Sequence, residues 1–199
     1  LILNGEIYNY LELRETLSKK GHKFNTNGDA EVVVHLYEEY GDKFLNFLNG
    51  MFALALCDIS NNLIFLARDR LGIKPLYYSN NEGIIKFASD ARALIRDKKP
   101  QISNKGFVEY LAQSYTSEQS IFEGIYKLPP ASIATISNGN MTKKKYWHID
   151  KFETYKSSQK DAEKNLLTLL KTSINGQLIS DVPVGFFLSG GLDSSTIVA

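Results

Sequence analysis

The sequence contains a single cysteine, Cys57, so it cannot form an internal disulfide, which is consistent with a reducing compartment and predicts a cytoplasmic protein. Cys57 lies within an apolar run, and we therefore expect a buried thiol that does not act as a nucleophile. The histidines are also few: His22, His35 and His148 show none of the spacings typical of metal sites. We expect them to be structural or surface residues.

Long apolar runs and an excess of one charge are absent too. A membrane-spanning helix needs about 20 consecutive apolar residues, so the sequence predicts no membrane span. The 23 Lys and Arg residues nearly balance the 22 Asp and Glu residues, and the net charge of +1 gives no reason to expect nucleic acid as a partner. The one tight basic run, Lys143 to Lys145, is expected to be a solvated hairpin edge.

The patterns that are present predict a mixture of helices and antiparallel strands. Hydrophobic residues make up 43% of the 199 residues, enough for one full domain and part of another. Apolar residues at three- and four-residue spacing predict helices within residues 11–17, 29–40, 103–114 and 166–178. Apolar runs bounded by turn residues predict strands at 22–24, 51–57, 63–67, 75–78, 84–88, 132–136, 141–147 and 184–188.

The composition turns polar at residues 157–160, which indicates a linker. We therefore expect two domains, residues 1–150 and 151–199. The sequence starts without methionine in an apolar run and stops soon after a glycine-rich motif, so we expect an internal fragment of a longer protein.

That glycine-rich motif, FFLSGGLDSS at residues 186–195, has the pattern of a buried strand, a turn and a helix start. Two adjacent glycines let main-chain N–H groups approach a ligand, and a helix N-terminus attracts anions, so the turn should hold phosphate. It is not a Walker loop, which would need a lysine. The alternative is an ordinary strand-to-helix turn of small residues.

A second motif, Asn4-Gly5-Glu6, lies near the other end of the sequence. An Asn amide and the N–H of the next glycine are the two donors that a tetrahedral oxyanion needs during amide hydrolysis. The alternative is a common turn sequence. Similarly, Asp29 at the start of a predicted helix could serve only as its N-cap, worth about 1 kcal/mol.

Successive sequence blocks together resemble the glutamine-hydrolysing asparagine synthetases, in order and in spacing, over nearly the whole chain. These blocks are LILNGEIYNYLELRETL, TNGDAEVVVHLYEEYG, FLNGMFALALCD, FLARDRLGIKPLYY, IFEGIYKLPP, YW and SDVPVGFFLSGGLDSS. The resemblance implies an α+β fold: an αββα sandwich of the N-terminal-nucleophile type, incomplete at its N-terminus. This class II glutamine amidotransferase domain would be followed by the start of a doubly wound α/β domain of the ATP-pyrophosphatase type.

The resemblance also implies roles for individual residues. In the first domain Asn4 and Gly5 would form the oxyanion hole, Glu6 would lie beside bound glutamine, and Asp29 would pair with its α-ammonium group. In the second domain the main chain of Leu188 would meet the adenine or ribose of ATP, and Asp193 would face Mg²⁺. The pyrophosphate would be held by Ser189, Gly190, Gly191, Ser194 and Ser195.

Some features of the family are missing or altered. The family's nucleophile is an N-terminal cysteine, and this residue and an arginine-bearing segment that clamps glutamine are absent. Ala131 stands where the family often has glycine, and Asp90 where it usually has glutamate. The segment from Arg68 to Pro75 is expected to be scaffold, with an internal ion pair and a turn.

The implied substrates are glutamine, aspartate and ATP, and the resemblance admits a homodimer. Ammonia released from glutamine would pass through an internal tunnel to an aspartate activated by ATP, giving asparagine, AMP and pyrophosphate. Two alternatives stay open. The acceptor could be another carboxylate, such as a sugar acid in surface polysaccharide assembly, because acceptor selection lies beyond Ala199. The chain could also belong to a non-catalytic glutamine-binding module.

Overall fold

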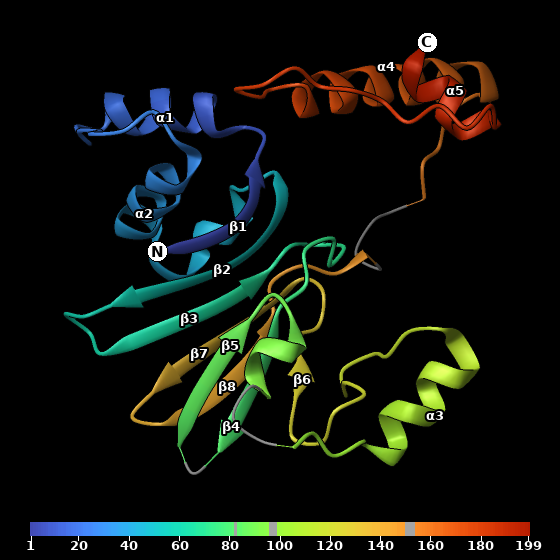
Figure 1. Cartoon of the computed structure of the whole chain (residues 1–199). Coiled ribbons are helices and arrows are strands. Elements are labelled where there is room, and N and C mark those ends of the chain that lie inside the picture. Colours follow the sequence, from blue (N-terminus) through green and yellow to red (C-terminus); the bar gives the residue numbers. More distant parts are fainter. Residues whose placement is uncertain (82, 96–98, 150–153) are drawn as a thin grey trace. The chain divides into compact units, whose positions relative to one another are not determined.

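The computed structural model describes residues 1–81, 83–95, 99–149 and 154–199 (Figure 1). The chain divides into two compact units, residues 1–150 and 151–199. None of the helices in the described ranges is both long and apolar enough to span a membrane.

A five-stranded antiparallel sheet with the strand order β1-β2-β3-β7-β8 forms the centre of the first unit. Its middle strands are apolar on both faces because both faces are covered by other layers. The predicted hairpin edge at Lys143 to Lys145 is confirmed as exposed. The strands are β1 (Ile2–Ile7), β2 (Gly50–Asp58), β3 (Leu63–Arg68), β7 (Ser132–Ser137) and β8 (Asn140–Lys145).

One face of this sheet is covered by helices α1 (Tyr10–Lys19) and α2 (Asp29–Tyr40), which lead into the short 3-10 helix η1 (Gly41–Asn46) (Figure 1). The apolar stripe predicted for α2 is confirmed, because Val32, Val33 and Leu36 are all buried in the core beneath it.

The opposite face packs against a second antiparallel sheet with the order β5-β4-β6. Its strands are β4 (Tyr77–Asn81), β5 (Ile84–Ala88) and β6 (Tyr126–Lys127). Leu66 from the first sheet and Leu76, Tyr78 and Leu128 from the second layer share one buried cluster. The 3-10 helix η2 (Ala91–Leu94) follows β5, and helix α3 (Asn104–Gln113) begins at its N-cap Ser103, which accepts a hydrogen bond from Gly106. The predicted α+β architecture with two antiparallel sheets is confirmed.

Asp69 organises the turn between β3 and β4 and is only 1% exposed. Its carboxylate accepts main-chain N–H bonds from Phe52 (3.2 Å), and from Leu71 (3.1 Å), Ile73 (2.9 Å) and Lys74 (3.0 Å) in the turn itself. The Arg68 guanidinium instead donates to three carbonyl groups, of Gly72, Lys74 and Leu128. The scaffold role predicted for this segment is therefore seen, but the predicted ion pair is wrong, because the Asp69 carboxylate and the Arg68 guanidinium each bind main-chain groups instead.

The strand predicted at residues 22–24 is wrong, because these residues form part of the loop between α1 and α2. Phe24 packs edge-on against His35 of α2, with ring centroids 4.6 Å apart. The apolar residue in this stretch thus serves side-chain packing, and no neighbouring strand is present to pair with it.

Glu31 fixes the same loop to α2. Its carboxylate accepts hydrogen bonds from the main-chain N–H groups of Asn25 (2.7 Å) and Thr26 (2.6 Å) and from the Thr26 hydroxyl (2.6 Å). These bonds, led by the one from Asn25, lower the pKa of Glu31 from 4.5 to about 2.

This depressed pKa predicts a pH-dependent contribution to stability. The contribution should be complete above about pH 4.5 and disappear as the pH falls towards 2, because the unfolded state then binds the proton more tightly. Thermal unfolding of the wild type and of Glu31→Gln should therefore show a difference in Tm that shrinks across this window. A difference that stays constant with pH would contradict the loop-anchoring role of the carboxylate.

The second unit contains helix α4 (Gln159–Gln177), capped by Ser158, and helix α5 (Leu192–Val198). The strand predicted at residues 184–188 is wrong, since these residues form no strand in the described part of this unit. Phe187 is fully exposed there. An apolar run becomes a strand only beside another strand, and the described residues of this unit supply only helices and loops.

Candidate functional site

The side chain of Asn4 projects from β1 towards the second sheet. Asn4 pairs with Ala53 of β2, and its Nδ2 donates a 2.8 Å hydrogen bond to the hydroxyl of Ser89, which directly follows β5. An amide group carries two hydrogens, so this bond orients the group and leaves a second hydrogen for an acceptor. The arrangement suits a fixed donor in a cleft.

Gly5 lies where β1 and β2 approach each other closely. Its φ angle is +146°, and a Cβ atom built on it would lie 2.0 Å from the carbonyl oxygen of Met51. Gly50, two register positions further along the same strand pair, has a comparable contact with the carbonyl oxygen of Glu6 at 2.2 Å. The fold therefore requires glycine at position 5 whether or not its N–H group binds an oxyanion.

Asp29 is tied to the end of β1. It is the first residue of α2, whose N-cap is Gly28, so the N-cap alternative for Asp29 is wrong. The Asp29 carboxylate instead accepts a 2.9 Å hydrogen bond from the main-chain N–H of Ile7, the residue after Glu6. The structure thus brings Asn4, Gly5, Glu6 and Asp29 together along one strand end.

The charge at this strand end is negative. Burial first, and then the charges of Glu6 and Asp69, raise the pKa of the neighbouring Tyr8 above its usual value of 10.0. Asp29 adds a third carboxylate near the end of β1, and carboxylates favour a bound ammonium group over a bound anion.

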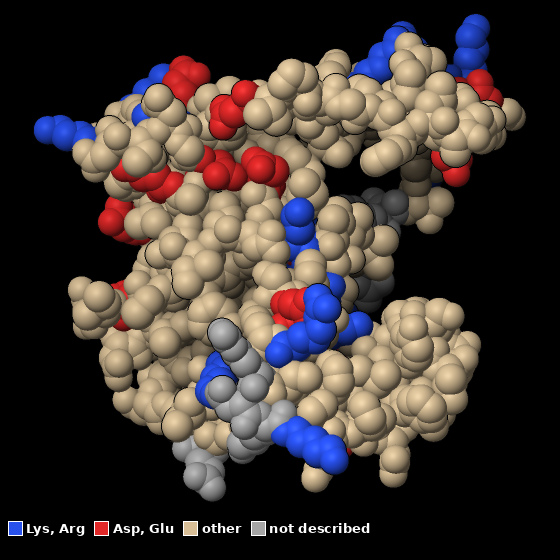
Figure 2. Space-filling model, viewed as in Figure 1, with Lys and Arg blue, Asp and Glu red and all other residues tan. Residues whose placement is uncertain are grey.

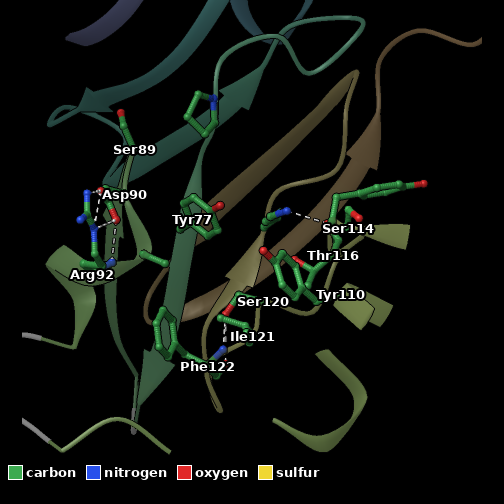
Figure 3. Close-up of a pocket in the computed structure, with 14 residues that line it drawn as sticks. Tyr77, Ser89, Asp90, Arg92, Tyr110, Ser114, Thr116, Ser120, Ile121 and Phe122 are labelled. Atoms are coloured by element: carbon green, nitrogen blue, oxygen red, sulfur yellow. Dashed lines mark hydrogen bonds and ion pairs between the residues drawn. The ribbon is translucent and has the colours of Figure 1, made fainter. Parts of the chain in front are cut away.

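Two hollows meet at Ser89, the residue that accepts the hydrogen bond from Asn4. The smaller, of about 230 Å³, is lined by Asn4 and by residues of β2 and β5, and the larger, of about 600 Å³, lies between η2, β4 and the end of α3. In Figure 3 the ion pair of Asp90 and Arg92 forms one wall of the larger hollow, and Tyr110, Ser114 and Thr116 form the other. The hydrogen bonds from Arg92 lower the pKa of Asp90 to about 2.

Sequence reasoning missed this larger hollow. Its walls come from segments between Pro75 and Lys127, and among them only Asp90, a departure from the resembled family, stood out in the sequence. Lys127 also lines it, donating a 2.6 Å bond to the carbonyl of Thr116, and burial lowers the pKa of its ammonium group.

Cys57 is exposed, so the prediction of a buried thiol is wrong. The pairing of β1 with β2 begins at Ile2 and Ala55. Cys57 lies two residues beyond Ala55 on β2, so β1 does not pair with it. Four residues along β2 separate it from Ala53, the partner of Asn4, which is about 13 Å at the usual strand rise. Distance, and not burial, removes Cys57 as a nucleophile for a carbonyl group held by Asn4.

In the second unit, the glycine-rich motif forms a turn into α5. Gly190 has φ of +79°, which favours glycine, and Gly191 is the N-cap of the helix. The hydroxyls of Ser189 and Ser194 lie 3.0 Å apart, and Ser194 donates to the carbonyl of Gly191.

This turn fits a phosphate group. The N–H groups in the first turn of a helix have no acceptor within the helix and carry its positive dipole end. Asp193 lies exposed in that first turn, where an oxygen ligand for a hard cation could be presented, and Leu188 and Ser195 flank the turn.

Comparison with known families assigns the two units. The model of the glutamine amidotransferase domain matches residues 1–147, and that of asparagine synthase matches residues 165–199. Asparagine synthetase [glutamine-hydrolyzing] 3 of Bacillus subtilis is 39% identical over 203 residues, covering 100% of this chain and 33% of that protein. Asparagine synthetase B [glutamine-hydrolyzing] of Escherichia coli is 35% identical over 201 residues, covering 100% and 31%. The chain spans about a third of the length of these curated relatives.

Solved structures agree on the fold of the first unit. Glutamine phosphoribosylpyrophosphate amidotransferase from Bacillus subtilis, solved with ADP and GMP, aligns with a TM-score of 0.53 at 20% identity, over 73% of this chain and 28% of that chain. The fold expected from the sequence resemblance, that of the N-terminal-nucleophile glutamine amidotransferases, is therefore confirmed. Because the amidotransferase model matches most of its residues, the chain belongs to the glutamine amidotransferase domain family.

Proposed function

We propose that this chain carries most of the glutamine site and the start of the nucleotide site of a glutamine-hydrolysing asparagine synthetase. The parent enzyme would transfer ammonia from glutamine to aspartate with consumption of ATP. The observation that carries this proposal is that two family matches, to an amidotransferase domain and to asparagine synthase, follow one another in a single chain. Relatives that match it along its whole length bear the same name.

In the glutamine site, the Asn4 amide and the Gly5 N–H would donate to the oxyanion that forms when the glutamine amide is attacked. The Ser89 hydroxyl holds the Asn4 amide in place for this role. The carboxylates of Glu6 and Asp29 would receive the α-ammonium group of glutamine. The nucleophile would be the N-terminal cysteine implied by the family resemblance, because Cys57 is too far from Asn4 to serve.

In the nucleotide site, the turn from Ser189 to Ser195 would hold the pyrophosphate of ATP through main-chain N–H groups and serine hydroxyls. Asp193 would supply a ligand to Mg²⁺, which when bound would offset the charge of the phosphates. The positive φ angle of Gly190 supports this fit, because it favours a residue without a Cβ atom where main chain would approach an anion.

The nucleotide site can be tested by exchange of labelled pyrophosphate into ATP, measured on the full-length enzyme with aspartate present. Asp193→Asn loses a charge and Gly190→Ala strains the turn, so each should lower the exchange rate at least about tenfold, equal to about 1.4 kcal/mol. Glutamine hydrolysis without ATP should be retained in both variants. Normal exchange in both would make the motif an ordinary turn.

The acceptor is tested separately with the same enzyme. Pyrophosphate release should depend on aspartate, and a panel of other carboxylic acids, including sugar acids, should not replace it. Release supported by a sugar acid but not by aspartate would overturn the proposed acceptor while leaving the glutamine site unaffected. Absence of glutamine hydrolysis would instead indicate a non-catalytic module.

A further inference from the structure

Three potential metal ligands converge where the loop after α1 meets α2, far along the helix from Asp29. Nδ1 of His22 lies 3.2 Å from Nδ1 of His35. Oε2 of Glu38 lies 2.7 Å from Nδ1 of His35 and 3.7 Å from Nδ1 of His22. The two imidazoles are mostly buried, with about 15% of each side chain exposed, whereas the Glu38 side chain is half exposed. Sequence spacing does not predict this cluster, because His22 and His35 are 13 residues apart.

The hydrogen bonds around the cluster direct lone pairs towards its centre. His22 Nε2 lies 3.1 Å from the Glu39 carboxylate, so this nitrogen is the donor and the lone pair of a neutral His22 is on Nδ1. Nδ1 therefore faces the cluster as an acceptor. If His35 also lacks a hydrogen on Nδ1, two lone pairs and a carboxylate meet at one point, an arrangement that a cation must stabilise.

The distances are compatible with a bound metal ion. A tetrahedral zinc site with bonds of 2.0–2.1 Å has ligand atoms about 3.3 Å apart, and the three separations seen here lie around that value. A single hydrogen on His35 Nδ1, shared between Glu38 and the lone pair of His22 Nδ1, would give the same two contacts, so metal titration has to distinguish the two states. The exposed side of Glu38 leaves room for a water molecule as a fourth ligand.

One carboxylate lies near the outer nitrogen of each imidazole, within hydrogen-bond distance of His22 and beyond it for His35. Glu39 contacts Nε2 of His22, and Oε1 of Glu31 lies 3.8 Å from Nε2 of His35. A carboxylate on the outer ring nitrogen is the usual partner of a zinc-bound histidine, because it fixes the ring and raises its basicity. Acidic side chains gather over this helical layer (Figure 2), and one of them, Glu39, also forms an ion pair with Lys20.

We propose that His22, His35 and Glu38 bind a divalent metal ion of the zinc type. The ion would link the loop between α1 and α2 to the middle of α2. Because α2 also carries Asp29 at its first residue, the metal would hold in place a helix that reaches the candidate glutamine site, without touching substrate. This proposal does not depend on the acceptor or on the proposed reaction.

The test uses the full 199-residue chain, freed of metal with a chelator, and calorimetric titration with Zn²⁺. One ion should bind per chain, and binding should raise the Tm. Substitution with Co²⁺ should give the visible absorption of a tetrahedral site. Glu39→Gln, which removes an outer partner, should weaken binding roughly ten- to a hundredfold, and loss of a direct ligand in His22→Gln or His35→Gln should weaken it further.

Two variants keep the test decisive. His148→Gln removes the histidine outside the cluster and should bind Zn²⁺ as the wild type does. Glu38→Gln changes a half-exposed side chain, so it should fold normally and still bind more weakly. Absence of one-to-one binding, unchanged affinity in His35→Gln, or an equal loss in His148→Gln would overturn the proposal and leave the cluster as a hydrogen-bonded histidine pair.

Discussion

Replacing Asp69 by alanine is expected to unfold the first unit. The substitution leaves four main-chain N–H groups around a buried position without their acceptor. Each unsatisfied buried donor costs about 1–3 kcal/mol, so the total loss should be at least about 4 kcal/mol. Domains are stable by only about 5–15 kcal/mol, and little of that would remain. Urea unfolding followed by circular dichroism would measure the loss.

Asp42→Ala is the matched control for this substitution. The Asp42 carboxylate forms an exposed ion pair of 2.7 Å with Lys144, and such pairs contribute at most about 1 kcal/mol. If the urea concentration at the midpoint of unfolding is similar for Asp69→Ala and Asp42→Ala, water or a shifted turn can replace the Asp69 carboxylate. The organising role assigned to Asp69 would then be wrong.

Asn4→Ala is expected to lower glutamine-dependent turnover of the full-length enzyme by about 10²- to 10³-fold. This is the usual loss when one oxyanion donor is removed, because the donor acts mainly in the transition state. With free ammonia as the nitrogen source, product formation should stay near the wild-type rate, since the second site is unchanged. Steady-state rates with the two nitrogen sources give the comparison.

Ser89→Ala separates the positioning of Asn4 from its chemistry. It removes the 2.8 Å bond that orients the amide but leaves the amide itself, so its effect on glutamine-dependent turnover should be clearly smaller than that of Asn4→Ala. Equal losses with glutamine and with ammonia in Asn4→Ala would mean that Asn4 serves folding. Such a result would remove the oxyanion assignment.

Much of the fold could be predicted because its signals are local. The helix at residues 29–40 and the hairpin that β2 and β3 form follow from apolar spacing and turn residues, and both are present. The apolar run at 184–188 carries the same kind of signal but forms no strand, because pairing depends on a neighbour that periodicity does not reveal.

The candidate site was only partly accessible from the sequence. Neighbouring residues such as Asn4 and Gly5 could be chosen by their chemistry, and family resemblance added Asp29. The bond from Asn4 to Ser89 joins residues 85 positions apart, and the pairing of His22 with His35 depends on how a loop returns to a helix. The exposure of Cys57 likewise depends on where β1 begins, which composition cannot show.

The close contact at Gly5 limits what comparison of natural sequences can teach about the oxyanion. A residue whose replacement would clash with the neighbouring strand is under selection for folding alone, so even an invariant glycine at this position would carry no information about catalysis. Natural variation at Asn4 is free of that ambiguity, because its side chain projects into a hollow. In relatives that have lost glutamine hydrolysis, we therefore expect position 4 to change first, while glycine is retained at position 5 because the fold requires it.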